Sequence, residues 1–177
     1  NNAFDPINLL RLKTLSPDVA EALAKHRGDL RFGLETLSPD VAEALAKHNG
    51  GLGLWPLKMI TPDVAEALAK HRGDLNLSRL ETLSPGAAAA LVKHQGKLNL
   101  SGLKILFPDI AEVLAKYRGE LYLYGLTSID KDTAEELVKY EGETLHLVDR
   151  TSIERDVLKI LKSNSNIKFQ SFEVWGK

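Results

Sequence analysis

Residues 15–26 read LSPDVAEALAKH, and this stretch decides the fold because the chain repeats it. Residues 37–48 repeat it letter for letter, and residues 60–71 differ only at the first two positions. Further copies lie at residues 83–94, 106–117, 129–140 and, in degenerate form, 153–162. Prolines recur at spacings of 22, 23, 23 and 23 residues, at Pro17, Pro39, Pro62, Pro85 and Pro108. A fixed period of this length is the signature of a stacked repeat array.

Each copy predicts a short helix. A side-chain oxygen stands before the helical pattern, where it can accept a bond from a free backbone N–H, at Ser16, Ser38, Thr61, Ser84 and Asp130. The proline that follows in the first five copies suits the first helical position, because no N–H is lost there. In the first copy Val19, Ala20, Leu23 and Ala24 form an apolar stripe of helical period.

Two further columns accompany the predicted helices. Oppositely charged pairs four residues apart are expected to bridge within each helix on its outer face, and they are Glu21–Lys25, Glu43–Lys47, Glu66–Lys70, Glu112–Lys116 and Glu135–Lys139. A glycine follows each helix and is expected to end it in the left-handed conformation, at Gly28, Gly50, Gly73, Gly96, Gly119 and Gly142.

A short strand is predicted after each glycine. The alternating apolar pairs have the period of a strand with its leucines turned inward, and they are Ile7/Leu9, Leu30/Phe32, Leu52/Leu54, Leu75/Leu77, Leu98/Leu100, Leu121/Leu123, Leu145/Leu147 and Ile167/Phe169. Strand–helix–strand connections of this length imply a parallel sheet with right-handed crossovers. We therefore predict an α/β solenoid of about eight short strands, with the sheet on the concave face and seven helices on the convex face.

The repeat resembles those of bacterial leucine-rich repeat proteins. The resemblance rests on the pattern Leu-x-Leu-x-x-Leu-x-x-Leu-Ser-Pro-Asp with its period of 23 residues, and it runs from about residue 7 to residue 169. It implies a right-handed leucine-rich-repeat solenoid whose shared role is partner binding. One slot departs from the family pattern: Leu80, Leu103 and Leu126 stand where the family usually places an asparagine.

Composition limits the classes of function. The 177 residues carry a formal net charge of −1 and include no cysteine, so we expect no nucleic-acid binding, no disulfide and no thiolate metal site. No apolar run reaches the length of a membrane span. No catalytic motif or cofactor motif is present, and His146, Asp149 and Ser152 lack the turn of a nucleophile elbow. We expect a non-enzymatic protein without a cofactor, and the sequence is equally compatible with the cytosol and the exterior.

One solenoid domain is expected over residues 1–177, with repeats over about 7–163 and a C-terminal cap over about 164–177. The cap is expected to use bulky side chains, namely Phe169, Phe172, Val174 and Trp175. At the other end Phe4 is the single large residue ahead of Ile7. We therefore expect the strand edge at residues 7–9 to be poorly covered, and to be met by a further repeat or by a second copy.

The residues between the strand leucines are expected to face the concave side, where they vary between repeats that are otherwise near copies. The first such column is Asn8, Arg31, Gly53, Asn76, Asn99, Tyr122, His146 and Lys168, and the second is Leu10, Gly33, Trp55, Ser78, Ser101, Tyr124, Val148 and Gln170. Aromatic residues and arginine supply most interface hot spots. The candidate partner-binding residues are Arg31, Trp55, Tyr122, Tyr124 and His146.

The leading hypothesis is a protein or peptide partner on this face, and the alternatives are a self-assembling structural segment and carbohydrate binding through the aromatic side chains. Trp55 has the simpler interpretation that it folds onto Pro56, and Asn76, Asn99, Ser78 and Ser101 are expected to form a side-chain ladder between strands. His26, His48, His71 and His94, continued by Tyr117 and Tyr140, are expected to pack or cap helix ends rather than bind metal. The alanine run at 87–90 is expected to be a smaller helix, with an apolar contact patch as the alternative.

Overall fold

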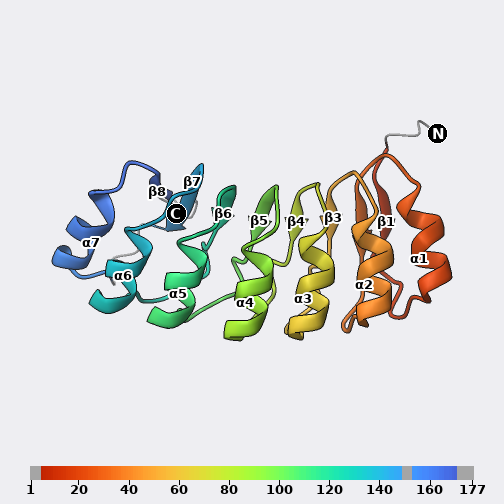
Figure 1. The fold of residues 1–177 in the computed structure, drawn as a ribbon, viewed down its shortest axis with the longest axis horizontal. Coiled ribbons are helices and arrows are strands. Elements are labelled where there is room, and N and C mark those ends of the chain that lie inside the picture. The colour runs from red at the N-terminus through yellow and green to blue at the C-terminus, as the bar shows by residue number, and fades with distance from the viewer. Residues whose placement is uncertain (1–4, 149–152, 171–177) are drawn as a thin grey trace, which may run out of the picture.

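The computed structural model describes residues 5–148 and 153–170. Strands and helices alternate along the described chain, as the sequence predicts (Figure 1). The strands are β1 (Ile7–Leu9), β2 (Leu30–Phe32), β3 (Leu52–Gly53), β4 (Leu75–Asn76), β5 (Lys97–Asn99), β6 (Glu120–Tyr122), β7 (Thr144–Val148) and β8 (Ile167–Gln170). The helices are α1 (Pro17–Ala24), α2 (Pro39–Ala46), α3 (Pro62–Ala69), α4 (Pro85–Leu91), α5 (Pro108–Leu114), α6 (Lys131–Leu137) and α7 (Arg155–Lys162).

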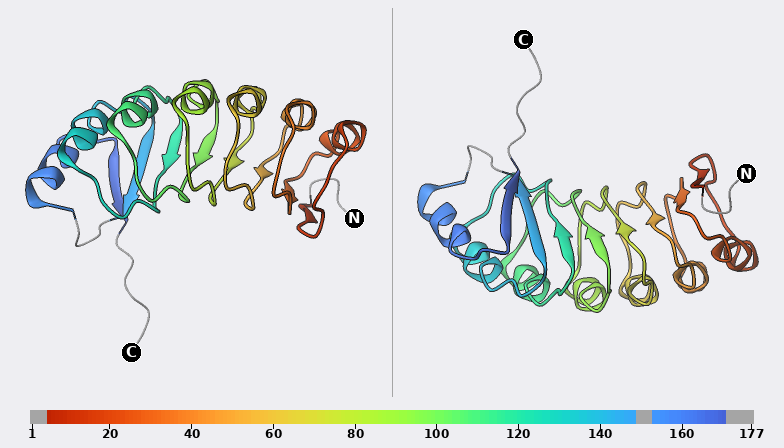
Figure 2. Two further views of the ribbon diagram at one scale, coloured as in Figure 1. Left: turned by 90° about the horizontal axis from the view of Figure 1, so that it is seen from below. Right: turned by 90° about the horizontal axis from the view of Figure 1, so that it is seen from above.

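All eight described strands form one parallel sheet in chain order, which confirms the predicted α/β solenoid. The helices lie along the outer side of a gently curved array and the strands along its inner side (Figure 2). Helices pack on the helices before and after them, and strands pair with the strands before and after them. The fold is therefore a series of nearest-neighbour contacts, as in other solenoids.

The core is a continuous layer of leucines between the sheet and the helices. Leu30, Leu52, Leu75 and Leu98 occupy one register row of the sheet and are fully buried. The alanines on the inner side of α1 to α6 are buried too, and their small size lets these helices lie close to the leucine layer. Each repeat thus buries its apolar face against its neighbours.

Side-chain caps start the helices where the sequence predicts them. Backbone N–H groups donate to Ser16, Ser38, Thr61, Ser84 and Asp130 over 2.8–3.4 Å. The cap position of α5 is Phe107 and that of α7 is Glu154, and neither side chain accepts such a bond. The cap rule is therefore broken in the middle of the array, at α5.

The glycine column does not act as predicted. No glycine in the described chain has a positive φ, so the expectation of left-handed helix ends was wrong. From Gly50 onward each glycine of the column instead lies against the preceding repeat: a Cβ added to Gly73 would stand 2.3 Å from the carbonyl oxygen of Gly50, and one added to Gly96 would stand 2.7 Å from that of Gly73. Glycine is needed because two backbones meet there without room for a side chain.

The charged pairs on the helices also differ from the prediction. Only Glu112 and Lys116 form the expected bridge within a helix, at 3.0 Å. Lys47 reaches back to Glu21 at 2.6 Å and Lys70 reaches back to Glu43 at 3.3 Å, so these pairs join neighbouring helices. All these groups are well exposed, so each bridge contributes little to stability.

A buried column of rings runs beside the glycines. His48, His71 and His94 stack in parallel with ring centroids 6.1 Å apart, and Tyr117 continues the stack at 6.4 Å. The Tyr117 hydroxyl donates to the carbonyl oxygen of Gly96 at 2.5 Å, and Tyr140 repeats this contact with Gly119 at 2.6 Å. The rings of this column therefore fill the contact between successive repeats, which we call the seam, as the packing interpretation predicts.

The two ends of the array are only partly described. Within the described chain, β1 pairs on one side with β2, and Ile7 and Leu9 remain half-buried. Phe4, Phe172, Val174 and Trp175 lie outside the described residues. In residues 5–148 and 153–170, no helix combines the length and apolar character needed to cross a bilayer.

Candidate binding surface on the concave sheet face

The strand register places the first predicted column in one continuous row. Arg31 pairs with Gly53, Tyr122 pairs with Asn99 and with His146, and His146 pairs with Lys168. The five candidate side chains, Arg31, Trp55, Tyr122, Tyr124 and His146, are all half-buried. The structure divides them into two groups rather than one.

The first group is the tyrosine cluster, defined as Tyr122, Tyr124 and His146. The Tyr122 and His146 rings lie face to face, with centroids 4.3 Å apart and planes 3° from parallel. Tyr124 meets both rings edge-on, at 5.7 Å from Tyr122 and 6.0 Å from His146. Because neighbouring strands bring these rings into mutual contact, the cluster is held in a fixed arrangement.

A carboxylate orients the tyrosine cluster. The Tyr122 hydroxyl donates to Glu120 Oε2 at 2.5 Å, and Lys97 Nζ lies 3.3 Å from the same oxygen. The hydrogen bond from Tyr122 lowers the pKa of Glu120, while burial and that carboxylate raise the pKa of Tyr122. Burial lowers the pKa of His146. At neutral pH the cluster therefore presents a neutral imidazole and neutral phenols beside an ionised carboxylate.

The second group is the tryptophan cluster, defined as Arg31, Gly53 and Trp55. The Arg31 guanidinium carbon lies 5.8 Å from the centroid of the Trp55 ring, within the range of a cation–π contact. A Cβ added to Gly53 would meet Trp55 Cζ2 at 3.2 Å, so the indole lies over the bare backbone of Gly53. Because Gly53 has no side chain, the indole ring can pack directly on the backbone of β3.

Polar residues separate the two clusters. Asn76 Oδ1 accepts from the backbone of Ser78 and Asn99 Oδ1 accepts from that of Ser101, both at 3.0 Å. These bonds close a turn within each repeat, so the expected ladder between strands was wrong for the asparagines. Ser101 Oγ does reach the next repeat, where it accepts from Tyr124 N at 3.4 Å.

Three residues that support the candidate side chains were not predicted from the sequence. Glu120, Lys97 and Gly53 position Tyr122 and Trp55, yet none was named as a candidate. Alternation along the strands places Glu120 and Lys97 on the same face of the sheet as Tyr122 and Asn99, but it carries no information on which of these side chains touch. The two predicted columns start after the first leucine of each strand, so they leave out the position before that leucine, which Glu120 and Lys97 occupy.

The described residues contain no group of three or more histidine, aspartate and glutamate side chains that could hold a metal ion. Asp149 and Ser152 lie outside the described residues. His146, the remaining member of that combination, stacks on Tyr122, and its buried Nε2 has no hydrogen-bond partner.

Known proteins give no information on the role of this surface. No protein-family model matches the chain, and no curated protein matches it either.

Proposed function

We propose that the concave sheet face is a binding surface for a protein or peptide partner, in a non-enzymatic chain of the bacterial leucine-rich repeat type. The observation that carries the proposal is the pairing of the tryptophan cluster and the tyrosine cluster on one face of the sheet. Both contain residue types that supply most interface energy, and both are held by contacts within the protein. A preformed surface lowers the ordering cost of association.

The spacing of the clusters suits an extended segment laid across the strands. Trp55 follows β3 and Tyr122 lies in β6, three strand spacings away, or about 14 Å. An extended chain advances about 3.3 Å per residue, so side chains about four residues apart would reach both clusters. The polar stretch between the clusters offers Asn76, Asn99 and Ser78 to the backbone of such a segment.

A peptide fits the tyrosine cluster better than a sugar ring does. Tyr122 and His146 cover one face of each other, so those faces are closed to a ligand. Carbohydrate binding relies on open aromatic faces, and here the stack offers mainly edges and the carboxylate of Glu120.

Selection from a random peptide display library, followed by affinity measurements on the intact chain, tests the proposal. We expect Trp55→Ala and Tyr122→Ala each to weaken the selected peptides by about tenfold or more while changing the melting temperature little, because both side chains lie outside the leucine core. Tyr122→Phe keeps the ring stack and loses only the bond to Glu120, so a smaller loss is expected.

Met59→Ala is the matched control, because Met59 is large and 72% exposed but lies in the loop before α3. Unchanged affinity in both the Trp55 and Tyr122 variants would reject the site. Binding to a glycan array that depends on Tyr122 would favour the carbohydrate alternative. Concentration-dependent light scattering that these variants abolish would favour self-assembly.

A further inference from the structure

The fifth repeat breaks the pattern of the array at the start of its helix. The position before the helix proline is a capping serine or threonine in the first four repeats, and in the fifth it is Phe107, which caps nothing and is 63% exposed. Replacing a capping residue usually costs stability. A large apolar side chain held in water at that cost indicates a role outside the fold.

A second residue departs from the pattern on the same surface. Ile105 is 60% exposed and occupies a slot that is polar in most other repeats. The residues in that slot of the other described repeats are Thr14, Thr36, Met59, Thr82 and Ser128. Within one repeat, Ile105 thus stands where most other repeats have threonine or serine, and Phe107 stands where they have a capping residue.

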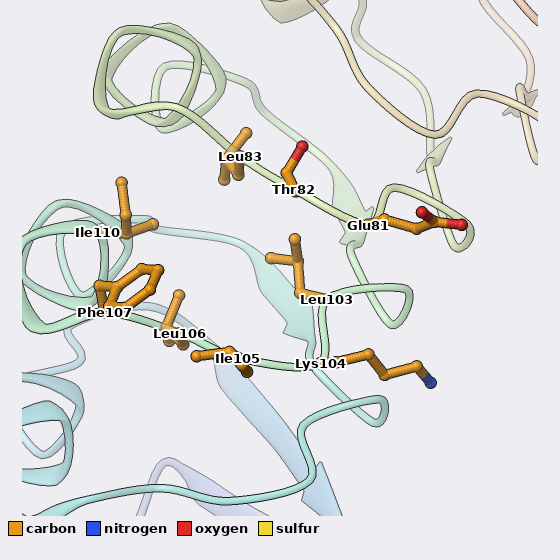
Figure 3. Close-up of a pocket in the computed structure, with 9 residues that line it drawn as sticks. All are labelled: Glu81, Thr82, Leu83, Leu103, Lys104, Ile105, Leu106, Phe107 and Ile110. Atoms are coloured by element: carbon orange, nitrogen blue, oxygen red, sulfur yellow. The ribbon is translucent and has the colours of Figure 1, made fainter.

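These two side chains border a hollow between the fourth and fifth repeats, here named the fifth-repeat hollow. Its volume is about 220 Å³, and its apolar lining is Leu83, Leu103, Ile105, Leu106, Phe107 and Ile110. Figure 3 shows it between the segment that carries Glu81 to Leu83 and the segment that carries Leu103 to Phe107, with Ile110 at its helix end. The hollow is large enough for one or two apolar side chains of a ligand.

A lysine that forms no ion pair within residues 5–148 and 153–170 lies at the rim of this hollow. In earlier repeats the equivalent charges pair across the seam, Lys13 with Glu35 at 2.6 Å and Lys58 with Glu81 at 3.0 Å. Lys104 is next in that row, but the sixth repeat has Thr127 in the slot, and within the described chain no carboxylate bridges Lys104. The rim therefore offers a positive charge to a carboxylate from outside.

The size of the surface fits a short segment rather than a second copy. Covering the exposed parts of Phe107 and Ile105 would bury on the order of 200–300 Å². A stable dimer needs roughly 800 Å² from each partner. The hollow is thus the size of a single hot spot, and its lining comes from the segments between strand and helix and from Ile110 of α5 rather than from the strands.

We propose that the fifth-repeat hollow is a second binding site, which takes a short apolar segment of a protein partner that carries an acidic residue beside its apolar side chains. Apolar side chains of that segment fill the space between Leu83, Leu103 and Ile110. Its carboxylate pairs with Lys104. The site does not depend on the concave face, so either can fail without the other.

The test uses the intact chain and a random 12-residue peptide display library. Enriched peptides should combine large apolar residues with aspartate or glutamate, and should bind the double variant Ile105→Thr plus Phe107→Ser about tenfold more weakly or worse. Because Phe107→Ser restores the kind of cap found in the first four repeats, this variant should keep or raise its melting temperature, by up to about 2–4 °C. Lost binding with retained stability separates a ligand site from a structural role.

Three controls make the result decisive. Met59→Thr removes an exposed apolar side chain from the same slot in the third repeat and should leave affinity unchanged. Lys104→Glu should weaken binding, with the loss greatest at low salt. Tyr122→Ala should have no effect on these peptides.

The proposal is overturned if no apolar and acidic pattern is enriched, or if the enriched peptides bind the double variant as tightly as the wild type. It is also overturned if binding depends on Tyr122 instead, or if Phe107 mediates a concentration-dependent dimer in sedimentation experiments.

Discussion

Single glycines set how closely the repeats approach one another. Gly50, Gly73, Gly96 and Gly119 each lie where an added Cβ would come within 2.7 Å of a carbonyl oxygen in the preceding repeat. That contact is with backbone rather than with the end of a flexible side chain, so the clash cannot be relieved by a rotamer change.

Replacing Gly73 by alanine should therefore destabilise the protein by about 1–3 kcal/mol, because the second and third repeats must separate. Gly86→Ala is the matched control. Gly86 lies in the first turn of α4 and a Cβ there meets only the ring of Pro62, at 3.2 Å. Alanine favours the helix at that position and the Pro62 ring needs to shift by only a few tenths of an ångström, so any loss of stability should be clearly smaller than at Gly73. Denaturant unfolding measures both, and equal effects would contradict the close-approach explanation.

The same residues show why sequence predicted the position of the glycines but not their role. A period of 23 residues reveals that Gly73 and Gly96 are equivalent, but it carries no information on the distance between them in space. The strand face was predictable because alternation alone assigns Arg31 and Tyr122 to one side. Gly53 and Glu120 could not be recognised as supports, since that requires knowing that Trp55 folds back over the sheet and that Tyr122 turns toward its own strand.

Side-chain contacts between successive helices, rather than within each helix, join the elements of the array. The predicted bridges within helices assumed isolated helices, whereas α1, α2 and α3 lie close enough for Lys47 and Lys70 to reach the preceding helix. The ring column beside the helix ends also joins neighbours. His71 lies between His48 and His94, and all three rings are buried with ring nitrogens that lack hydrogen-bond partners. Burial in the contact between successive repeats thus lowers the pKa of these imidazoles and favours their neutral form.

Burial, reinforced by the charges of His94 and His48 when protonated, lowers the pKa of His71 from 6.5 to about 4. The unfolded chain therefore takes up a proton between pH 6.5 and pH 4 that the folded chain does not. The contribution of neutral His71 to the free energy of unfolding is therefore present in full well above pH 6.5, and it is lost as the pH falls from 6.5 towards 4. His71 alone should lower the free energy of unfolding by about 2 kcal/mol between pH 7 and pH 5.

Histidine-to-tyrosine exchange tests this pH dependence, since tyrosine occupies the same slot in the fifth and sixth repeats. His71→Tyr should flatten the fall in stability between pH 7 and pH 5, and its hydroxyl can reach the Gly50 carbonyl as Tyr117 reaches that of Gly96. The reverse change, Tyr117→His, should make the fall steeper. Urea unfolding across the pH range measures both, and parallel profiles for the three proteins would contradict the role of the column.

The whole molecule behaves as a row of interchangeable units. The register holds even where repeat length changes, because Leu121 pairs with Leu145, 24 residues later, and Leu30 pairs with Leu52, 22 residues later. At the longer repeat, the Glu143 N–H donates to the carbonyl oxygens of Arg118 and Gly119, each at 3.1 Å, at the entry to β7. Local adjustment near the strand therefore protects the alignment of the concave face.

Deleting residues 76–98 tests this modular behaviour, since it joins Leu75 to Asn99 in place of Leu98 and removes one complete strand–helix unit. We expect a shorter but folded array, with stability reduced because one interface between repeats is lost. Circular dichroism and a cooperative thermal transition measure this outcome. An unfolded or aggregated product would contradict nearest-neighbour stacking.

That register has a consequence for how partner choice can change. Each strand advances the recognition surface by about 4.8 Å, so gain or loss of one unit between Trp55 and Tyr122 alters their separation by that increment and leaves both side chains intact. Unequal recombination within the gene would add or remove such a unit. The protein would then select longer or shorter ligands, with no substitution at the contact residues themselves.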